Sequence, residues 1–537
     1  MKLRTIVKIA VTSSVVLLCA GFALYSFFRL SAAESNKDFN LYELVPPTTS
    51  AVFSTDNMLE FVAEVEELTC SKNSQYLHVS KIFSYLKQYL YTLLEDAPHG
   101  LSRQMNQMLI SFHEPDDIHN QVLYCRLGTG DRELINHFVQ KYTSPLYPPK
   151  KFNYKGEEIS IYPMADGDFL ACYLTADFMA LSYQKKLIEN VIDTYKSGKS
   201  LADDPTFKGT VAPKKSTAIA TIYTQLDGLM GWTEFDVKLR DDFIYFTGIS
   251  HEADTCFTFM SVLRQQASVK GFPEETLPST AFYFSKQGVT DWTSLLAYND
   301  QRLSTDLLST DGVHSRDKEL SRYLMENAGQ DLVACLFQRE DTLQAAAAII
   351  SLSVADVAEA ERMLRSLIHT FPPIAGGNNS RITYYYTANK AYPVYRIPQT
   401  TLFARLTSFE APTLDIYATF YHGRLLLAPD EESLSYYIRQ LEKGEVLDGA
   451  VAYQAGMDNL SDSYHFMLMA DFGHVFGQPD KPVGFVSDFF LRNSDFFRNF
   501  IFFVQFTCST DGVVYSNIVL KYKNTNEQTQ INADNRR

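Results

Sequence analysis

The hydrophobic pattern of this chain begins with an uncharged run from Ile9 to Phe28, preceded by basic residues and followed by Arg29. At a rise of about 1.5 Å per residue, the run makes a helix of about 30 Å, the thickness of the hydrocarbon core of a bilayer. It predicts a transmembrane helix. Because Lys and Arg precede the run whereas Glu34 and Asp38 follow it, the positive-inside rule predicts a cytoplasmic N-terminus and an exported remainder.

Three interpretations of this segment compete. The apolar run exceeds the roughly 7 to 15 residues of a signal-peptide core, which favours an uncleaved anchor. Cleavage stays open, because Ser31-Ala32-Ala33 offers small residues to a signal peptidase and a cut after Ala33 would release a soluble protein. A lipid anchor on Cys19 is disfavoured, since the bulky Leu18 stands where a lipoprotein signal has a small residue.

Beyond this run, a similar order of elements occurs twice. A proline-led turn and an apolar, strand-like run span Leu44 to Ser54, and the same pattern returns at Thr276 to Ser285. Each start is followed by a helical pattern, a Pro-Pro pair and a second helix closed by glycine. Chance similarity of common strand and helix patterns is the alternative, but the shared order favours an internal duplication.

The most similar pair of segments is a strand followed by a helix. In the first segment, the strand begins at Phe178, apolar residues then recur at helical spacing, and Gly198 follows. In the second, the strand begins at Arg424 and Gly444 follows the helix. Glycine in this position is typical of a helix C-cap.

Strand-like runs end each copy, with turns at Arg240 to Asp242 and at Asp511-Gly512 that predict hairpins and therefore antiparallel sheets. The sequence thus predicts an α+β fold, in which an N-terminal transmembrane helix precedes two tandem, duplicated units of largely antiparallel sheet with packed helices. The predicted divisions are a cytoplasmic N-terminus and anchor (1–30), a polar spacer (31–43), a first repeat unit (44–270), a second repeat unit (271–523) and a polar tail (524–537).

The charge and the cysteines narrow the functional classes. A formal net charge of −15 disfavours binding to nucleic acid and other polyanions. Six cysteines lie beyond the apolar run, at irregular spacing and without a Cys-x-x-Cys motif: Cys70, Cys125, Cys172, Cys256, Cys335 and Cys508. Several lie in apolar runs, which favours buried free thiols, although an exported protein could form disulfides.

Ser197-Gly-Lys-Ser200 matches the end of a phosphate-binding loop. The first glycine of that motif would fall at position 193, which is Asp193, and the segment follows a helix instead of a strand. We therefore interpret it as a helix C-cap flanked by lysines.

The densest set of potential metal ligands is His113-Glu-Pro-Asp-Asp-Ile-His119. Pro115 prevents a helix that would place both histidines on one face, so an acidic surface turn is the favoured interpretation. The Ser-x-x-Lys motif of penicillin-recognising enzymes occurs at Ser182 to Lys185 and Ser315 to Lys318, but no Lys-Thr-Gly partner accompanies it. The sequence therefore assigns no catalytic, cofactor-binding or metal-binding residue and no cofactor.

The apolar run, the Leu-Val-Pro-Pro-Thr start at Leu44 and the repeated Gly-closed helix resemble an uncharacterised family of membrane-anchored envelope proteins of Gram-negative bacteria, classed as a domain of unknown function. The resemblance implies a single-pass protein of the inner membrane whose C-terminal ectodomain faces the periplasm. It supplies no catalytic residues.

Two functional hypotheses follow. The favoured one is a membrane-anchored, exported, non-catalytic protein that binds or assembles an envelope protein or ligand, because a doubled module readily forms a large binding surface. Its membrane contact is through Ile9 to Phe28. The alternative is an anchored periplasmic hydrolase of an envelope polymer, so catalysis is disfavoured but stays open.

Overall fold

The computed structural model describes most of the chain between residues 39 and 523. The described residues are 39–73, 105–114, 117, 119–128, 131–132, 135, 147–164, 167–210, 218–226, 230–251, 257–302, 311–339, 346–371, 380–388, 390–407, 414–449, 451–477, 490–491, 493–509 and 511–523. The predicted anchor at Ile9 to Phe28, most of the predicted spacer and the predicted polar tail lie outside them. Within the described ranges, no helix is both long enough and apolar enough to cross a bilayer.

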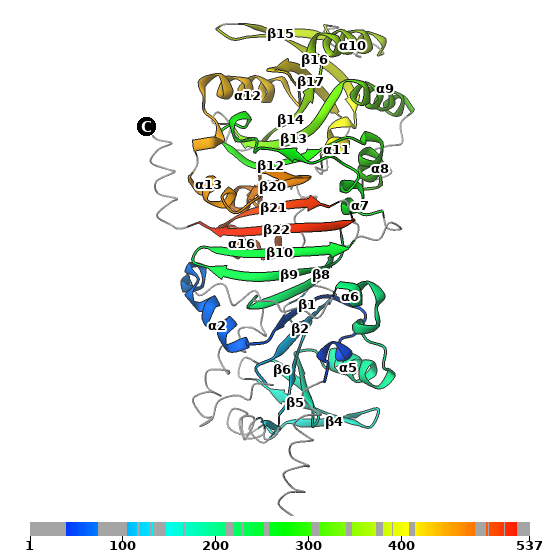
Figure 1. Cartoon of the computed structure of the whole chain (residues 1–537), viewed down its shortest axis with the longest axis vertical. Coiled ribbons are helices and arrows are strands. Elements are labelled where there is room, and N and C mark those ends of the chain that lie inside the picture. Colours follow the sequence, from blue (N-terminus) through cyan, green and yellow to red (C-terminus); the bar gives the residue numbers. More distant parts are fainter. Residues whose placement is uncertain are drawn as a thin grey trace, which may run out of the picture. The chain divides into compact units, whose positions relative to one another are not determined.

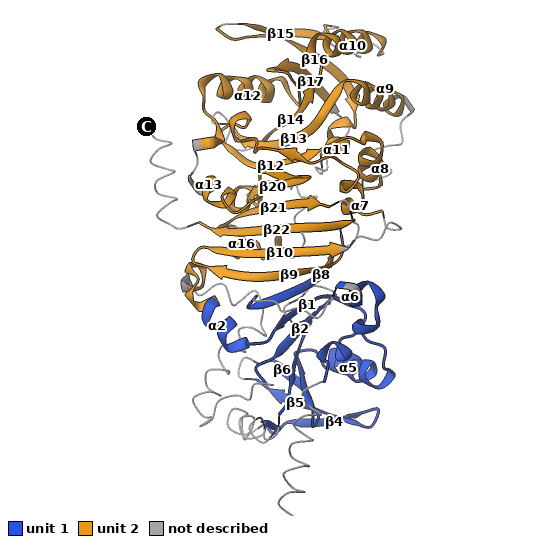
Figure 2. Cartoon of the chain, in the orientation of Figure 1, with its two compact units in different colours: residues 1–64, 77–224 blue, residues 65–76, 225–537 orange. Residues whose placement is uncertain are grey.

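The chain divides into two compact units (Figure 2). Unit 1 contains residues 1–64 and 77–224, and unit 2 contains residues 65–76 and 225–537. The predicted repeat limits, 44–270 and 271–523, stay a prediction.

Unit 1 is built on an antiparallel sheet whose strands pair in the order β8-β1-β2-β3-β7-β6-β5-β4 (Figure 1). The strands are β1 (Thr49–Thr55), β2 (Met108–His113), β3 (Gln121–Arg126), β4 (Lys150–Tyr154), β5 (Glu157–Pro163), β6 (Phe169–Leu174), β7 (Phe178–Ser182) and β8 (Ala220–Leu226). Helix α5 (Lys185–Ser197) packs against β6 and β7, and α6 (Pro205–Thr210) follows it. Helix α2 (Met58–Glu67) follows β1.

Unit 2 contains a longer antiparallel sheet with the order β9-β10-β22-β21-β20-β12-β13-β14-β18-β17-β16-β15. The strands are β9 (Met230–Arg240), β10 (Phe243–His251), β12 (Ala281–Gly288), β13 (Ala328–Gln338), β14 (Ala346–Val354), β15 (Ile382–Tyr386), β16 (Ala391–Thr400), β17 (Leu414–Tyr421), β18 (Arg424–Ala428), β20 (Phe466–Asp471), β21 (Phe500–Cys508) and β22 (Val513–Tyr522). Two short strands, β11 (Val269–Lys270) and β19 (Ser463–Tyr464), pair separately.

Helices pack on the sheet of unit 2 at several places. They are α7 (Phe259–Leu263), α8 (Trp292–Arg302), α9 (Asp311–Asn327), α10 (Val357–Thr370), α11 (Leu402–Leu406), α12 (Glu431–Lys443), α13 (Val451–Met457), α14 (Phe472–Val475) and α16 (Ser494–Phe497). Helix α12 lies against β14 and β18, where its buried Leu434 and Ile438 join a core with Phe284 and Cys335. Helices α9 and α10 pack against β16.

The same strand order occurs in two successive runs of the chain. In unit 1 the strands pair in the order β8-β1-β2-β3-β7-β6-β5-β4. In unit 2 the corresponding strands of the later run pair in the order β20-β12-β13-β14-β18-β17-β16-β15, so each strand has the same neighbours within its run as its counterpart in unit 1. A backbone hydrogen bond also recurs: Leu201 N–H donates to the Val45 carbonyl at 2.8 Å, and Leu447 N–H donates to the Leu277 carbonyl at 3.0 Å.

The predicted fold class is wrong. Strand exceeds helix, and the structure is dominated by antiparallel sheet, whereas the sequence predicted an α+β fold of duplicated units behind a transmembrane helix. Much of the difference lies in the lengths of the elements: β9 and β22 contain 11 and 10 residues, whereas α7, α11, α14 and α16 contain at most 5. The predicted antiparallel pairing is confirmed.

Candidate functional site

The segment Ser197 to Ser200 ends helix α5. Gly198 has a φ of +63°, in the left-handed region, and its N–H donates to the Thr194 carbonyl at 3.0 Å. Gly444, after α12, has a φ of +73° and donates to the Leu441 carbonyl at 3.1 Å. Both glycines are the helix C-caps that the sequence predicted.

The structure does not bring the two histidines of the candidate metal segment together. His113 lies in β2, where its Nε2 is 2.8 Å from the Ser111 hydroxyl. His119 Nδ1 lies 2.8 Å from an Asp117 oxygen, and its Nε2 lies 3.4 Å from Asp168. Among the described residues, no group of His, Cys, Asp or Glu has the arrangement of a metal site.

Ser111 and His113 have the geometry of a nucleophile and a base, but they are buried. The Ser111 hydroxyl also lies 3.0 Å from the Tyr124 hydroxyl, and all three side chains are at most 5% exposed. Burial lowers the pKa of His113 to about 4, so the imidazole is neutral at pH 7. The group forms a neutral hydrogen-bonded chain inside the protein, without a described route for a substrate.

The two Ser-x-x-Lys segments have separate local contacts. The Ser182 hydroxyl donates to the Gln121 carbonyl at 2.7 Å, whereas Lys185 pairs with Glu189 on the surface of α5. On α9, Ser315 is exposed to solvent. In the described contacts, neither serine therefore has the buried lysine partner that penicillin-recognising enzymes use to activate the serine.

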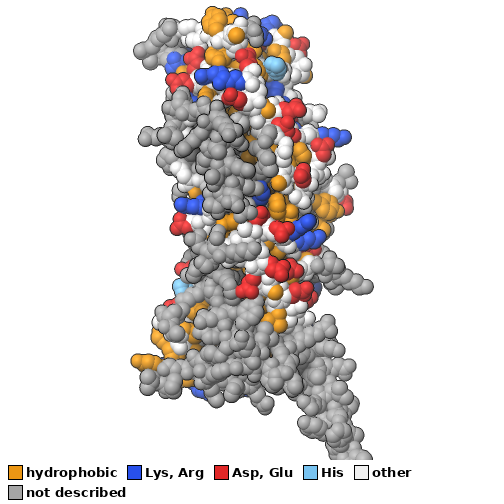
Figure 3. All heavy atoms as spheres, turned by 90° about the vertical axis from the view of Figure 1, so that its left-hand side faces the viewer, with side chains coloured by type: hydrophobic (Ala, Val, Ile, Leu, Met, Phe, Trp, Pro, Cys, Tyr) orange, Lys and Arg blue, Asp and Glu red, His pale blue; other side chains and the backbone are white. Residues whose placement is uncertain are grey.

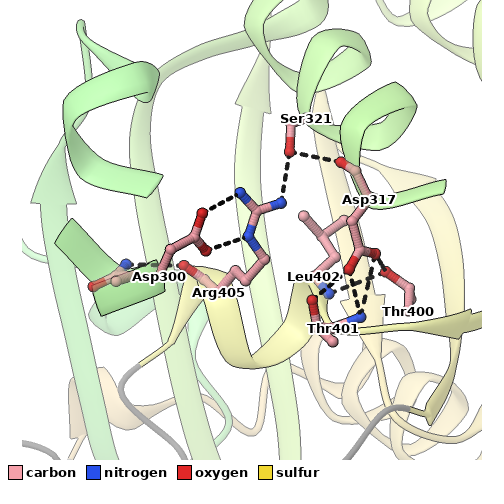
Figure 4. Close-up of polar contacts among 8 residues, drawn as sticks. Asp300, Asp317, Ser321, Thr400, Thr401, Leu402 and Arg405 are labelled. Atoms are coloured by element: carbon pink, nitrogen blue, oxygen red, sulfur yellow. Dashed lines mark hydrogen bonds and ion pairs between the residues drawn. The ribbon is translucent and has the colours of Figure 1, made fainter. Parts of the chain in front are cut away.

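A buried polar cluster lies where α9 meets the end of β16 (Figure 4). The Asp317 carboxylate accepts hydrogen bonds from the hydroxyls of Thr400 and Thr401 and from the Thr401 N–H at 3.2 Å. Asp317 is 5% exposed and the two threonines at most 1%. Because both carboxylate oxygens are satisfied, the cluster can stabilise the junction at which α11 begins.

Arg405 extends this cluster to a third helix. Its guanidinium group contacts the Asp300 carboxylate of α8 through two nitrogen atoms, and it donates to the Ser321 hydroxyl at 2.9 Å. Ser321 in turn donates to the Asp317 backbone carbonyl at 2.7 Å. The arrangement holds α8, α9 and α11 together (Figure 4). Its donors and acceptors contact one another, so we interpret it as a structural cluster.

The described cysteines are free thiols. Cys70, Cys125, Cys172 and Cys335 are buried and Cys508 is half-buried. Burial raises the pKa of Cys70 to about 11 and that of Cys172 to about 12, which suppresses the reactive thiolate. Four of these residues are thus buried free thiols, as predicted, whereas Cys508 is only half-buried. Cys256 lies outside the described part.

A different kind of site lies at the edge of the sheet in unit 2. Strand β15 pairs with β16, and no other described strand pairs with it (Figure 1). Tyr384 and Tyr386 project from the same face of β15, are 54% and 72% exposed, and have ring centroids 6.3 Å apart. Exposed tyrosines on an open edge strand are a typical protein-binding feature.

The hydrogen-bond pattern of the hairpin shows which backbone groups face outward. Thr387 N–H donates to the Lys390 carbonyl, and Arg396 N–H donates to the Arg381 carbonyl, each at 2.9 Å. Since hydrogen-bonded residues alternate along an antiparallel ladder, the intervening Tyr384 and Tyr386 direct their N–H and C=O groups away from β16. These two residues therefore present both aromatic rings and backbone donors and acceptors.

The corresponding edge in unit 1 is protected. Strand β4 pairs with β5 through a two-residue turn at Lys155-Gly156, which makes Tyr154 a hydrogen-bonded position and directs the backbone of Lys151 and Asn153 outward. Lys151 is exposed and pairs with Glu158 at 2.7 Å. A lysine on an edge strand opposes the addition of another strand, because its charge would have to be desolvated. The outward positions of β15 carry no such charge.

At the end of unit 2 that contains β15 and α10, Figure 3 shows hydrophobic side chains at the surface beside basic and acidic ones. Sequence reasoning missed this edge. The signal was the uncharged run Ile382-Thr-Tyr-Tyr-Tyr386, but an edge strand cannot be told from an internal one before the pairing is known.

Part of the chain matches a known protein family. A family model described as a protein of unknown function (DUF3352) matches residues 111–239. No curated protein and no solved structure matches the chain. The match confirms the predicted resemblance to a domain of unknown function, and it does not extend to the predicted family of membrane-anchored envelope proteins. The matched residues run from β2 to β9 and include the Ser111 cluster, but not β15.

Proposed function

We propose that this protein is a non-catalytic binding or assembly protein of the bacterial envelope, which binds a partner polypeptide by strand addition at β15. The observation that carries the proposal is the uncharged open edge at Tyr384 and Tyr386. In strand addition, backbone hydrogen bonds supply affinity and alternate side chains supply specificity. Both kinds of group face outward at these two residues.

The location is part of the same proposal. We place the protein at the inner membrane, with the residues after Arg29 in the periplasm, because of the uncharged run and the charge pattern around Ile9 to Phe28. The partner is an envelope protein. A nucleic-acid partner is disfavoured by the net charge of −15.

The alternative, a periplasmic hydrolase, has less support. The Ser111 and His113 pair is the described group nearest to a nucleophile and base, and both side chains are buried. An enzyme would need this pair, or another group, to become accessible to a polymer.

The test compares mild crosslinking of the full-length protein in its own membranes for the wild type and two variants. Tyr384→Pro removes an outward N–H from β15 without removing a donor to β16, because proline is tolerated at such edge positions. Asn153→Pro makes the matched change on the outward side of β4. We expect polypeptide adducts that disappear with Y384P and persist with N153P.

Adducts that are identical in all three proteins would overturn strand addition at β15. Hydrolysis of an envelope polymer by a preparation without any crosslinked partner would overturn the non-catalytic assignment. The unfolding midpoint of each variant, measured in urea, establishes that the substituted protein is folded in the assay.

A further inference from the structure

We infer that the strand that adds to β15 is the β15 of a second copy of this chain, so that two copies form a symmetric antiparallel pair. The inference rests on the proposed function, since it names the partner of the same edge. It follows from the sequence of the edge, from its outward hydrogen-bonding groups and from a pairing already present within the chain.

The edge is complementary to itself. A two-fold axis requires the same surface on both subunits. If two β15 strands pair antiparallel about Tyr384, that residue lies opposite its own counterpart, and Tyr386 lies opposite Ile382. The pairing then places aromatic beside aromatic and aromatic beside β-branched side chains, which are favourable cross-strand pairs. No charged residue of β15 faces a like charge, because the strand contains none.

The hydrogen-bonding groups fit the same register. Tyr384 and Tyr386 direct their N–H and C=O groups to the open side. In a pair centred on Tyr384, each Tyr384 donates to and accepts from the other, and each Tyr386 does so with Ile382. Alternate residues of both strands thus meet as hydrogen-bonded pairs, as an antiparallel ladder requires.

The chain already uses edge-to-edge pairing of this kind. Hairpins β9–β10 and β21–β22 end the two runs of similar strand order, and β10 pairs antiparallel with β22 from Phe243 opposite Lys521 to His251 opposite Val513. Two hairpins of unit 2 that are far apart in the sequence are thus joined by pairing of their outer strands. A β15 to β15 contact repeats this arrangement between two molecules.

The contact is small, which limits its strength. A stable protein interface buries about 1,200 to 2,000 Å² in total, more than a pair of five-residue strands provides. The dimer is therefore weak and depends on concentration.

The net charge of −15 opposes association through long-range repulsion, while β15 itself is uncharged. Because salt screens repulsion beyond about 8 Å at physiological ionic strength, added salt strengthens this dimer.

The decisive experiment is position-specific disulfide formation in the purified full-length protein. In a hydrogen-bonded antiparallel pair the Cα atoms lie about 5.5 Å apart, which is within the range of a disulfide. Tyr384→Cys therefore gives a covalent dimer under mild oxidation. Thr383→Cys is the matched control, because position 383 faces position 385 of the other copy instead of itself. The wild type measures the background from the native thiols.

Sedimentation velocity over a concentration series complements the crosslinking. We expect a monomer–dimer equilibrium in which Y384P raises the midpoint concentration by about tenfold or more, while N153P leaves it unchanged. Salt should lower the midpoint for the wild type.

The outcomes separate this inference from the proposed function. Loss of adducts to other proteins with Y384P, together with no covalent dimer of the Tyr384→Cys variant, would overturn the self-pairing and leave strand addition standing. Equal crosslinking at positions 383 and 384 would overturn the register and with it the symmetric pair. If Y384P changes neither the adducts nor the sedimentation, both proposals are wrong.

Discussion

Arg405 forms a two-point ion pair with Asp300, in which Nε lies 2.6 Å from Oδ1 and Nη2 lies 2.8 Å from Oδ2. The pair joins residues far apart in the sequence, on α11 and α8, and Arg405 is only 11% exposed. Such planar pairs are stronger than contacts between single atoms because both nitrogens are directed at the carboxylate. This pair and the Asp317 cluster fix how α8, α9 and α11 meet at the end of β16.

Replacing Asp300 should therefore destabilise unit 2. We expect Asp300→Asn to lower the free energy of unfolding by about 1 to 2 kcal/mol, because a mostly buried guanidinium loses its charged acceptor. Urea denaturation followed by circular dichroism measures the change. Glu359→Gln is the control, since Glu359 and Arg362 form an exposed pair that should not affect stability measurably. Equal effects of both substitutions would contradict a specific role of the Arg405 contact.

His113 predicts a pH dependence of stability. Its pKa in the folded protein, about 4, is below its ordinary value of 6.5, because burial disfavours the imidazolium. The unfolded chain therefore binds more protons between these values, and stability falls as the pH decreases from about 6.5 toward 4. The loss from this residue is about 3 kcal/mol at most. Urea unfolding of the wild type and His113→Gln, measured from pH 4 to pH 7, should show a weaker dependence in the variant.

The exposed His314 on α9 provides the control for this measurement. His314→Gln should retain the pH dependence of the wild type. The absolute stability of H113Q is not the test, because the substitution also alters packing around Ser111 and Tyr124. An unchanged slope in H113Q would show that His113 titrates normally and is accessible to solvent.

Local features of this chain could be predicted from the sequence, because they depend on neighbouring residues. The glycine caps at Gly198 and Gly444 and the hairpin turns at Asp241-Asp242 and Asp511-Gly512 are set by backbone conformations within a few residues. Each is present where the pattern placed it.

Features that depend on distant pairing could not be predicted in this way. The pairing of β10 with β22 could not be predicted, because these strands are far apart in the chain. The Asp317 cluster joins α9 to Thr400 and Thr401, which follow Asp317 by 83 and 84 residues, and polar residues without a motif gave no signal for it. The open edge at β15 could not be predicted for the same reason. The sequence of an apolar strand does not show whether the strand has one neighbour in the sheet or two.

The two glycine caps provide a paired stability prediction. Gly198 and Gly444 both have positive φ, and a Cβ atom added at either site would meet no atom within 4 Å. Gly198→Ala and Gly444→Ala should therefore each cost about 1 kcal/mol from backbone strain alone. Urea denaturation measures both, and Lys199→Ala, next to the first cap, is a control with little expected effect. A much larger loss of stability at one site would contradict this prediction, because it would require a steric clash that the open space around both glycines does not produce.

Asp471 predicts an acid-sensitive contact in unit 2. Burial by itself raises its pKa, but the hydrogen bond from His474 and the charge of Lys523 outweigh burial and lower the pKa to about 2. Because this is below the ordinary value of 3.8, the ion pair stabilises the fold above about pH 4, and its contribution disappears as the pH falls toward 2.

Asp471→Asn should therefore lower the free energy of unfolding by about 2 kcal/mol at pH 7 and make little difference near pH 2. Lys523 Nζ lies 2.7 Å from the carboxylate and is 12% exposed, so it would lose its partner in a largely buried place. Asp495→Asn is the matched control, because the Asp495 side chain is 96% exposed where it meets Arg498. A stability difference between wild type and D471N that stays constant from pH 7 to pH 2 would exclude the ion pair as its cause.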